Sequence, residues 1–369
     1  MQLTVSRDTL LKALSRAQGI VGKKSTMPIL SNILIETVAN DRFTVTATDL
    51  DIFSKGEYEG LSEKTGRICV NARDLYEIAR NLPAGNASLE TVDQTSVRLV
   101  SARTSYRIPT ANVDDYPPMP DFGAVEYIAI DPDVLGGLFD RTLFSVANDD
   151  PRVFLNGINL EIPEAGRVRL VSTDGHRLSL IDGTVERTPE LDHPVIVPRK
   201  GVVELRKLLE ESADPLEMGF AGSNAFFRRA DLLLVMRLIE GEFPDYTMVI
   251  PKSSTNVVKV GLVDFQNALK RMSILSLERS SGVRFALAPG EMTIESSDPD
   301  RGEGKEQLEI DYQGATLHIG FNARYFLDAI AVMKGNEVIL ELSDELSPCV
   351  IRDAGEPGFL CVVMPVRIT

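Results

Sequence analysis

One kind of short amphipathic stretch occurs three times in this sequence, at nearly equal spacing. The copies are residues 71–83 (NARDLYEIARNLP), 198–211 (PRKGVVELRKLLEE) and 322–335 (NARYFLDAIAVMKG), and their starts lie 127 and 124 residues apart. Apolar residues recur at helical spacing in each copy, and Asn71 is suited to cap the first helix. A period of about 125 residues is much longer than that of a solenoid unit. The sequence therefore predicts one domain that is repeated three times.

Each repeat is also predicted to begin with another helix, at residues 7–18, 131–146 and 264–275. Alternating apolar and polar residues predict two strands after each of these helices, at 30–36 and 43–50, 154–160 and 168–173, and 283–287 and 292–296. Strand-rich tails close the repeats at 87–109, 215–237 and 337–367. Two helices on antiparallel strands in each repeat define an α+β fold. Pro-rich breaks near 116–122 and 243–254 place the domains at 1–121, 127–246 and 247–369.

Composition limits the kinds of protein that this chain can be. A hydrophobic content of 43% with 25% charged residues is ordinary for a globular protein, and no apolar run is long enough to span a membrane. The first residues lack the pattern of a signal peptide. Only Cys69, Cys349 and Cys361 are present, without a CxxC pair, which argues against disulfides and a zinc site. These features predict a cytoplasmic protein without a metal or other cofactor.

The net charge of −15 is unevenly distributed. A negative total argues against nucleic acid, because affinity for phosphate comes from clustered Lys and Arg. The six predicted helices, however, sum to about +3, so the remainder carries about −18. This split is compatible with two faces of opposite sign, and equally with helices that carry ordinary mixed surface charge.

The segment 172–178 (STDGHRL) is the most distinctive short motif. Asp174 and His176 raise the question whether they serve a Ser nucleophile, but the sequence has no GxSxG elbow and only three histidines. The interpretation that we prefer is a hairpin turn at Asp174-Gly175, with His176 and Arg177 at the rim of a peptide-binding edge. No catalytic residue is predicted.

Three further segments have a structural and a functional interpretation. Residues 22–26 (GKKST) fail the P-loop pattern, so a solvated turn is favoured over a loop that presents Lys23 and Lys24 to phosphate. Residues 148–152 (NDDPR) predict a turn rather than a metal site. The apolar C-terminus, 362–369, is either an edge strand ended by Pro365 or one wall of a Val- and Met-lined groove.

Along essentially its whole length the sequence resembles the bacterial DNA polymerase III beta subunit, the family of sliding clamps. The motifs that carry the resemblance occur in the family's order: TMPIL (26–30), TDL (48–50), FLNG (154–157), TDGHRL (173–178), VIVPRKG (195–201), FPDY (243–246), GFN (320–322) and Met364-Pro365 with Arg367. The resemblance implies three similar domains per chain and a ring-shaped, head-to-tail homodimer around duplex DNA. It also implies a processivity factor that makes or breaks no bond.

The resemblance further implies three sets of site residues. A groove for partner peptides would comprise Leu155, Thr173, Gly175, His176, Arg177, Leu178, Pro244, Val249, Asn322, Tyr325, Leu346, Val362, Met364, Pro365, Val366 and Arg367. Contacts to DNA would fall on Lys24, Arg73, Asn148, Arg152, Arg199 and Lys200. The dimer contact would fall on Arg103, Tyr106, Ile274, Leu275, Glu303 and Glu306.

The implied function is a clamp that encircles double-stranded DNA without reading its sequence and tethers the replicative polymerase. Implied partners are a second copy of the chain, the DNA polymerase III alpha subunit, the clamp loader delta subunit, and repair and translesion polymerases. One alternative is a specialised clamp paralogue, for example a resistance copy. The other is a nucleic-acid-processing enzyme, which would need a carboxylate–metal cluster that the sequence does not offer.

Overall fold

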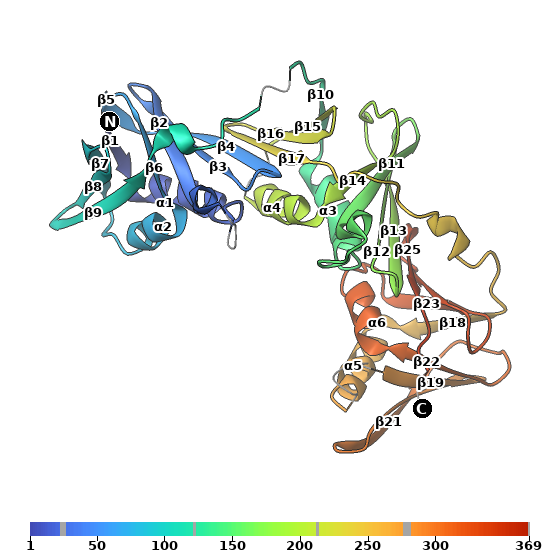
Figure 1. Cartoon of the computed structure of the whole chain (residues 1–369). Coiled ribbons are helices and arrows are strands. Elements are labelled where there is room, and N and C mark those ends of the chain that lie inside the picture. Colours follow the sequence, from blue (N-terminus) through green and yellow to red (C-terminus); the bar gives the residue numbers. More distant parts are fainter. Residues whose placement is uncertain (23–26, 121–122, 212–213, 276–281, 368–369) are drawn as a thin grey trace. The chain divides into compact units, whose positions relative to one another are not determined.

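Helices and strands follow one another in an order that recurs three times along the chain (Figure 1). The computed structural model describes residues 1–22, 27–120, 123–211, 214–275 and 282–367. Six α-helices lie in the described residues, two in each repeat, and every strand pairing is antiparallel. The predicted α+β class with three repeated domains is therefore confirmed.

The bounds of the elements are as follows. The first repeat contains β1 (Gln2–Ser6), α1 (Arg7–Gln18), η1 (Pro28–Ser31), β2 (Asn32–Ala39), β3 (Arg42–Thr48), β4 (Ile52–Glu59), β5 (Leu61–Lys64), β6 (Arg67–Asn71), α2 (Ala72–Arg80), β7 (Asn86–Asp93), β8 (Ser96–Ser101), β9 (Thr104–Ala111) and η2 (Val113–Asp115). The second contains β10 (Tyr127–Ile130), α3 (Pro132–Leu143), η3 (Val153–Asn156), β11 (Gly157–Glu164), β12 (Arg167–Thr173), β13 (Arg177–Thr184), β14 (Val195–Pro198), α4 (Arg199–Glu210), β15 (Leu216–Ala221), β16 (Asn224–Arg229), β17 (Leu232–Arg237) and η4 (Tyr246–Met248). The third contains β18 (Asn256–Gly261), α5 (Leu262–Ser273), β19 (Gly282–Ala288), β20 (Glu291–Asp298), β21 (Gly302–Glu309), β22 (Leu317–Asn322), α6 (Ala323–Ile330), β23 (Glu337–Leu342), β24 (Cys349–Asp353) and β25 (Glu356–Val363).

Side-chain caps fix where several helices begin. Ser6 accepts a hydrogen bond from the Thr9 amide, and Asn71 accepts hydrogen bonds from the amides of Arg73 and Asp74 in the first turn of α2. Asn322 caps α6 in the same way. Such caps satisfy amides that have no partner within the helix. The predicted cap at Asn71 is therefore confirmed.

Aromatic packing forms the core of the third repeat. Phe265 of α5 and Phe326 of α6 meet edge to face, with ring centroids 6.1 Å apart. Phe326 also packs against Phe285 of β19 at 5.2 Å and Phe321 of β22 at 5.0 Å. All four side chains are fully buried, and each stabilises the fold by about 1.5–3 kcal/mol through removal from water. This packing holds α5 and α6 on the sheet.

Strand pairing joins neighbouring repeats. β17 of the second repeat pairs with β4 of the first, with Val235 opposite Phe53. β13 of the second repeat pairs with β25 of the third, with Leu180 opposite Leu360. The resulting sheets have the orders β10-β15-β16-β17-β4-β3-β2-β6-β9-β8-β7-β1-β5, β14-β11-β12-β13-β25-β24-β23-β18 and β21-β20-β19-β22.

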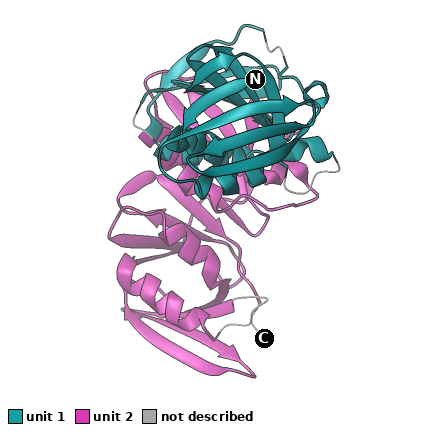
Figure 2. Cartoon of the chain, turned by 90° about the vertical axis from the view of Figure 1, so that its left-hand side faces the viewer, with its two compact units in different colours: residues 1–132, 200–238 teal, residues 133–199, 239–369 magenta. Residues whose placement is uncertain are grey.

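Because of these pairings, the chain divides into two compact units rather than three. One unit contains residues 1–132 and 200–238, and the other contains 133–199 and 239–369 (Figure 2). Each half of the middle repeat packs with the neighbouring repeat whose sheet it extends. None of the helices in the described ranges combines the length and the apolarity needed to cross a bilayer.

Two predicted strands begin too early. Residues 28–31 form the short helix η1, where Ser31 donates a hydrogen bond to the Pro28 carbonyl, and β2 begins only at Asn32. Residues 153–156 form η3, and β11 begins at Gly157. Local hydrogen bonds close both short helices, and the alternation of apolar and polar residues in the sequence does not reveal them.

Candidate functional site: an apolar groove at the turn between β12 and β13

The turn between β12 and β13 is locked by its own side chains. The carboxylate of Asp174 accepts hydrogen bonds from the amides of His176 at 2.9 Å and Arg177 at 3.0 Å. Gly175 has φ = +88°, a conformation that other residues rarely adopt. Thr173 and Leu178 face each other across the hairpin. The predicted hairpin is confirmed.

Arg177 turns inward rather than projecting from the rim. Its guanidinium donates to Asp174 Oδ2 at 3.0 Å, to Asp328 Oδ2 at 2.6 Å and to the Phe144 carbonyl at 2.5 Å. The group also lies 4.6 Å from the centroid of the Tyr325 ring, and its side chain is only 10% exposed. The expectation of a polar group at the rim is wrong for Arg177, because four partners hold it below the surface.

The C-terminal strand completes the wall of the site. β25 lies between β13 and β24, so the first of the two interpretations of the C-terminus, an edge strand, is wrong. Beyond the strand, the Met364 amide donates to the His176 carbonyl at 2.9 Å, and the Val366 amide donates to the Gly320 carbonyl at 2.8 Å. These bonds keep the chain end docked, whereas free ends normally fray.

A cavity of about 330 Å³ opens between the turn and β25. Its lining is mostly apolar, and Leu155, Leu178 and Val362 form its buried floor. The cavity brings together these residues of the predicted groove: Leu155, Thr173, Gly175, Arg177, Leu178, Pro244, Val249, Val362 and Met364. Pockets of this size and character are typical binding sites for small apolar groups.

The other predicted groove residues are placed outside the cavity lining: His176, Asn322, Tyr325, Leu346, Pro365, Val366 and Arg367. Two of them contact residues that line the cavity. Tyr325 stacks under Arg177, and the His176 carbonyl holds Met364. Leu346 is 72% exposed and Asn322 caps α6.

Four lining residues were not predicted for the groove: Arg152, Phe154, Asp245 and Tyr246. Phe154, Asp245 and Tyr246 belong to the FLNG and FPDY motifs, so proximity in those motifs was the signal that could have found them. The Tyr246 hydroxyl donates to Glu161 Oε2 at 2.9 Å. Burial raises the pKa of Tyr246, which keeps this hydroxyl protonated as a donor.

The residues expected to contact DNA have varied surroundings. Arg73, Asn148 and Arg152 are exposed, and Arg152 is paired with Asp150 through two bonds of 3.0 Å. Lys24 lies outside the described residues.

Arg199 and Lys200, the first two residues of α4, make contacts that support the local structure. Arg199 donates to the carbonyls of Leu143 and Val146 at 3.2 Å each. Lys200 donates to the Ile20 carbonyl at 2.8 Å and contacts the Asp49 carboxylate. Their charges are therefore partly committed within the chain.

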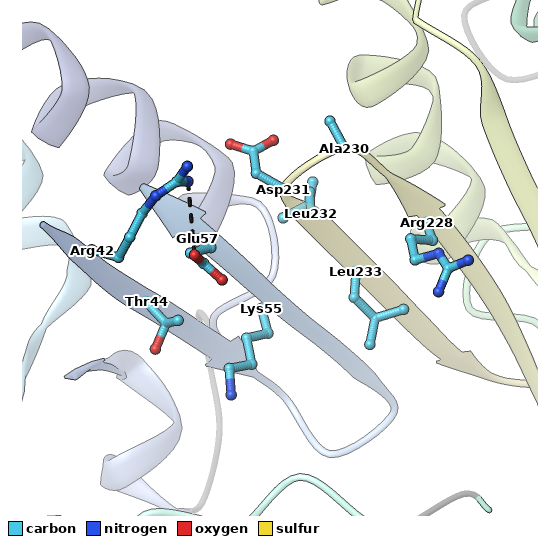
Figure 3. A pocket seen from close by; sticks show the side chains of 9 residues that line it. All are labelled: Arg42, Thr44, Lys55, Glu57, Arg228, Ala230, Asp231, Leu232 and Leu233. Atoms are coloured by element: carbon cyan, nitrogen blue, oxygen red, sulfur yellow. Dashed lines mark ion pairs between the residues drawn. The ribbon is translucent and has the colours of Figure 1, made fainter. Parts of the chain in front are cut away.

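A second cavity, of about 510 Å³, lies on the face of β3, β4, β17 and β16 (Figure 3). Its lining carries mixed charges. Arg42 pairs with Glu57 at 3.7 Å, as the dashed line in Figure 3 shows, and Arg228 pairs with Glu217 at 2.6 Å. The surface lacks the apolar floor of the first cavity, so we do not assign a peptide to it.

Three of the six residues expected at a dimer contact lie on two open strand edges. Tyr106 is on β9, where residues 104–109 pair with β8 but with no strand on their other side in the described chain. Glu303 and Glu306 are on β21, which ends its sheet. Ile274 follows α5 and is 67% exposed, and Leu275 is half-buried. Arg103 is exposed in the turn before β9.

The described residues offer no group of three or more His, Cys, Asp or Glu side chains placed to hold a metal ion. Asp149 and Asp150 of the NDDPR segment lie in a loop, where Asp150 is paired with Arg152 and its backbone exchanges hydrogen bonds with the Asn156 amide at 2.9 and 2.8 Å. The prediction of a turn there is confirmed.

Comparison with known proteins covers the full chain. Three family descriptions match in order: the DNA polymerase III beta subunit N-terminal domain at residues 1–120, its central domain at 129–245 and its C-terminal domain at 247–367. A beta sliding clamp of Caulobacter vibrioides is 34% identical over 100% of both chains. Solved structures of the Caulobacter crescentus pol III beta and of the Pseudomonas aeruginosa DNA polymerase III subunit beta align over 100% of both chains, with TM-scores of 0.93 and 0.91 and identities of 34% and 32%. The chain therefore belongs to the DNA polymerase III beta subunit family, the beta sliding clamps.

Proposed function

We propose that this sliding clamp tethers DNA polymerase III to DNA by holding a short linear peptide of the polymerase in the groove between the β12–β13 turn and β25. By its family the chain is a DNA sliding clamp and a processivity factor rather than a catalyst. The observation that carries the peptide proposal is the apolar cavity of about 330 Å³, with Leu178 and Val362 in its floor and Met364 in its lining. A few buried apolar anchors supply most of the affinity in such contacts.

The same groove would serve several partners in turn. We assign to it the alpha subunit of the polymerase, the delta subunit of the clamp loader, and repair and translesion polymerases. Val and Met side chains suit this use, because a flexible apolar lining adapts to different peptides. These partners act at chromosomal DNA, which agrees with a cytoplasmic location.

The domain boundaries that we propose are 1–121, 127–246 and 247–369. Two chains would join head to tail, with the open edge of β9 in one chain against the open edge of β21 in the other. Unpaired strand edges readily accept a further strand. A head-to-tail contact closes into a ring when its rotation permits, and a ring holds DNA by enclosure.

Duplex DNA would then need only weak contacts that are independent of sequence. We assign these to Arg73, Asn148, Arg152, Arg199, Lys200 and Lys24. Phosphate contacts of this kind position a protein without reading bases, and they leave it free to slide.

The topological proposal is tested on circular DNA. The protein should have the mass of a dimer by light scattering and, once loaded, should stay on a nicked circle and leave it after linearisation. Retention on linear DNA with open ends would show gripping rather than enclosure and would contradict the proposal.

The groove is tested by fluorescence anisotropy with a capped peptide that carries two adjacent leucines. Val249→Ala, at a residue of the cavity lining, should weaken binding about fivefold. Val257→Ala is the matched control, because Val257 is similarly exposed at 48% but lies on β18 outside the lining. Equal affinities for the two variants would contradict the assignment of the groove. A pull-down with the polymerase tail would separate a housekeeping clamp from a specialised paralogue.

A further inference from the structure

A third cavity adjoins the groove on the same unit. It has a volume of about 580 Å³ and shares Pro244, Asp245 and Tyr246 with the groove lining. The two cavities are therefore neighbours along the segment 244–246. The remaining lining residues are Asn159, Glu161, His193, Pro194, Ile196, Gly241, Glu242, Phe243 and Thr247.

The register of the sheet places the cavity's polar groups together. Asn159 and Glu161 are two residues apart on β11, so their side chains leave the same face. Ile196 of β14 is the direct cross-strand partner of Asn159. The remaining lining comes from residues 193–194 and from the segment 241–247, which includes Phe243 and Tyr246.

One buried acceptor, on a residue that lines this cavity, has no hydrogen-bond partner. Asn159 Nδ2 donates to Glu161 Oε1 at 2.7 Å, which fixes the orientation of the amide because a carboxylate accepts only from the nitrogen. Asn159 Oδ1 is then left buried without a hydrogen bond, on a residue that is 2% exposed. A buried acceptor without a donor is unfavourable, so a donor from an occupant would be favoured here.

The charged side chains that line this cavity are mostly acidic. Glu161, Glu242 and Asp245 are carboxylates, and His193 is the one basic side chain among the described residues that line the cavity. The nearby Arg169 is held by Asp182 at 2.7 Å, so its charge is already matched. An occupant that fits this surface carries positive charge and several N–H donors.

The walls suit the stem of such a group. Phe243 and Tyr246 are aromatic, and Pro194 and Ile196 are apolar. Lys and Arg side chains pack their methylene stems on apolar surface, and their cationic heads are attracted to aromatic faces.

We propose that this cavity binds a lysine or arginine side chain of a partner peptide whose apolar residues fill the adjoining groove. The head group lies among Glu161, Glu242 and Asp245 and donates to Asn159 Oδ1. The cavity thereby adds a preference for a basic residue that flanks the apolar anchor. This inference rests on the proposed peptide-binding function.

Capped eight-residue peptides test the inference. Each carries two adjacent leucines and, at one flanking position on either side in turn, Lys, Gln or Glu. At one of these positions the Lys peptide should bind the wild-type dimer about tenfold more tightly than the Gln peptide, because a close charge pair has about this effect. The Glu peptide should bind more weakly than the Gln peptide. The advantage of Lys should shrink as salt is raised.

Variants that remove carboxylates test whether the advantage of the Lys peptide arises in this cavity. In Glu161→Gln/Glu242→Gln the advantage of Lys over Gln should fall to about twofold or less, while the affinity for the Gln peptide is kept. Glu186→Gln/Glu190→Gln is the matched control: it removes the same charge from two exposed residues outside both linings and should keep the full advantage. Thermal melting of all the variants shows whether each is folded, and Glu242→Gln alone, at an exposed residue, repeats the test if the double variant is not.

The outcomes distinguish a failure of the basic-residue site from a failure of the peptide groove. If the Gln peptide binds the wild type but Lys gives no advantage at any flanking position, the basic-residue site is wrong and the groove stands. The site is also wrong if the advantage survives in Glu161→Gln/Glu242→Gln. If the Gln and Lys peptides both fail to bind the wild type, the groove assignment falls, and this inference falls with it.

Discussion

The guanidinium of Arg177 holds the carboxylate of Asp328 at 2.6 Å, although the two residues are 151 positions apart in the chain. Arg177 belongs to the β12–β13 hairpin of the second repeat, and Asp328 lies on α6 of the third. The bond therefore ties the hairpin that lines the groove to a helix of the next repeat. Because the Arg177 side chain is only 10% exposed, its charge is removed from most solvent screening.

Arg177→Ala should lower the free energy of unfolding by about 2–4 kcal/mol, since Asp174 and Asp328 would lose a largely buried partner. It should also weaken the affinity of the groove for peptide. Urea denaturation and peptide anisotropy measure the two effects. The control is Arg324→Ala at an exposed position of α6, where a change within about 0.5 kcal/mol is expected. Equal effects of the two substitutions would show that the Asp328 contact is not stabilising.

The Arg152–Asp150 pair predicts a pH dependence of the loop beside the groove. Hydrogen bonds from the Arg152 side chain and amide lower the pKa of Asp150 to about 2, from 3.8. A lowered carboxyl pKa contributes stability that is fully present above about pH 4 and is lost as the pH falls toward 2. NMR titration of the Asp150 carboxyl carbon should give a midpoint near 2.

Arg152→Gln supplies the comparison for this titration. Without the guanidinium, the midpoint should return toward 3.8, and the pH dependence of the loop should move with it. A midpoint that is the same in both proteins would mean that the pair does not persist in solution.

The beginnings of some helices were predictable from the sequence, whereas the beginning of α5 and some of the ends were not. Helix α1 covers the predicted residues 7–18, and Asn71 caps α2, because local side chains decide these starts. Helix α6 was expected to reach residue 335 but ends at Ile330. The carboxylate of Asp353 binds the amides of residues 334 and 335 at 2.7 and 3.0 Å, and this distant contact fixes the loop after the helix.

The groove was predictable only through the resemblance to a family, and only in part. Periodicity identified the apolar strands, but the docking of Met364 on the His176 carbonyl depends on a contact between residues that are far apart in the sequence. The same limit explains Arg177, which the hairpin motif placed at the rim and the structure places below it. The partly buried Tyr246 was missed because its contact with Glu161 spans 85 positions.

The three thiols should resist alkylation in the folded protein. Burial raises the pKa of the Cys361 thiol to about 12 and the pKa of Cys69 to about 11, and it raises the pKa of Cys349 well above its ordinary value. All three side chains are buried, and the thiolate is the reactive form. Iodoacetamide at pH 8 should therefore label none of them until denaturant is added. Mass spectrometry measures the labelling, and prompt modification of Cys349 or Cys361 would show that β24 and β25 open readily.

The proposed dimer contact predicts that charges at the end of α5 give monomers. Ile274 is 67% exposed in the single chain, and Leu275 approaches Gly304 on β21, next to the open strand edge. In Ile274→Asp/Leu275→Asp, two carboxylates would have to lose water on association without a matched partner, at a cost of several kcal/mol. The dissociation constant of the dimer should rise at least about 100-fold.

Light scattering over a range of protein concentrations measures this change. The matched control is Val263→Asp, because Val263 is 64% exposed on the same helix but lies at its other end. The control should keep the dimer mass, since its carboxylate stays in solvent whether or not the edges of β9 and β21 are joined. A dimer that survives in Ile274→Asp/Leu275→Asp would show that the two chains associate through another surface. Loss of the dimer in both variants would instead point to an interface that covers the whole exposed face of α5.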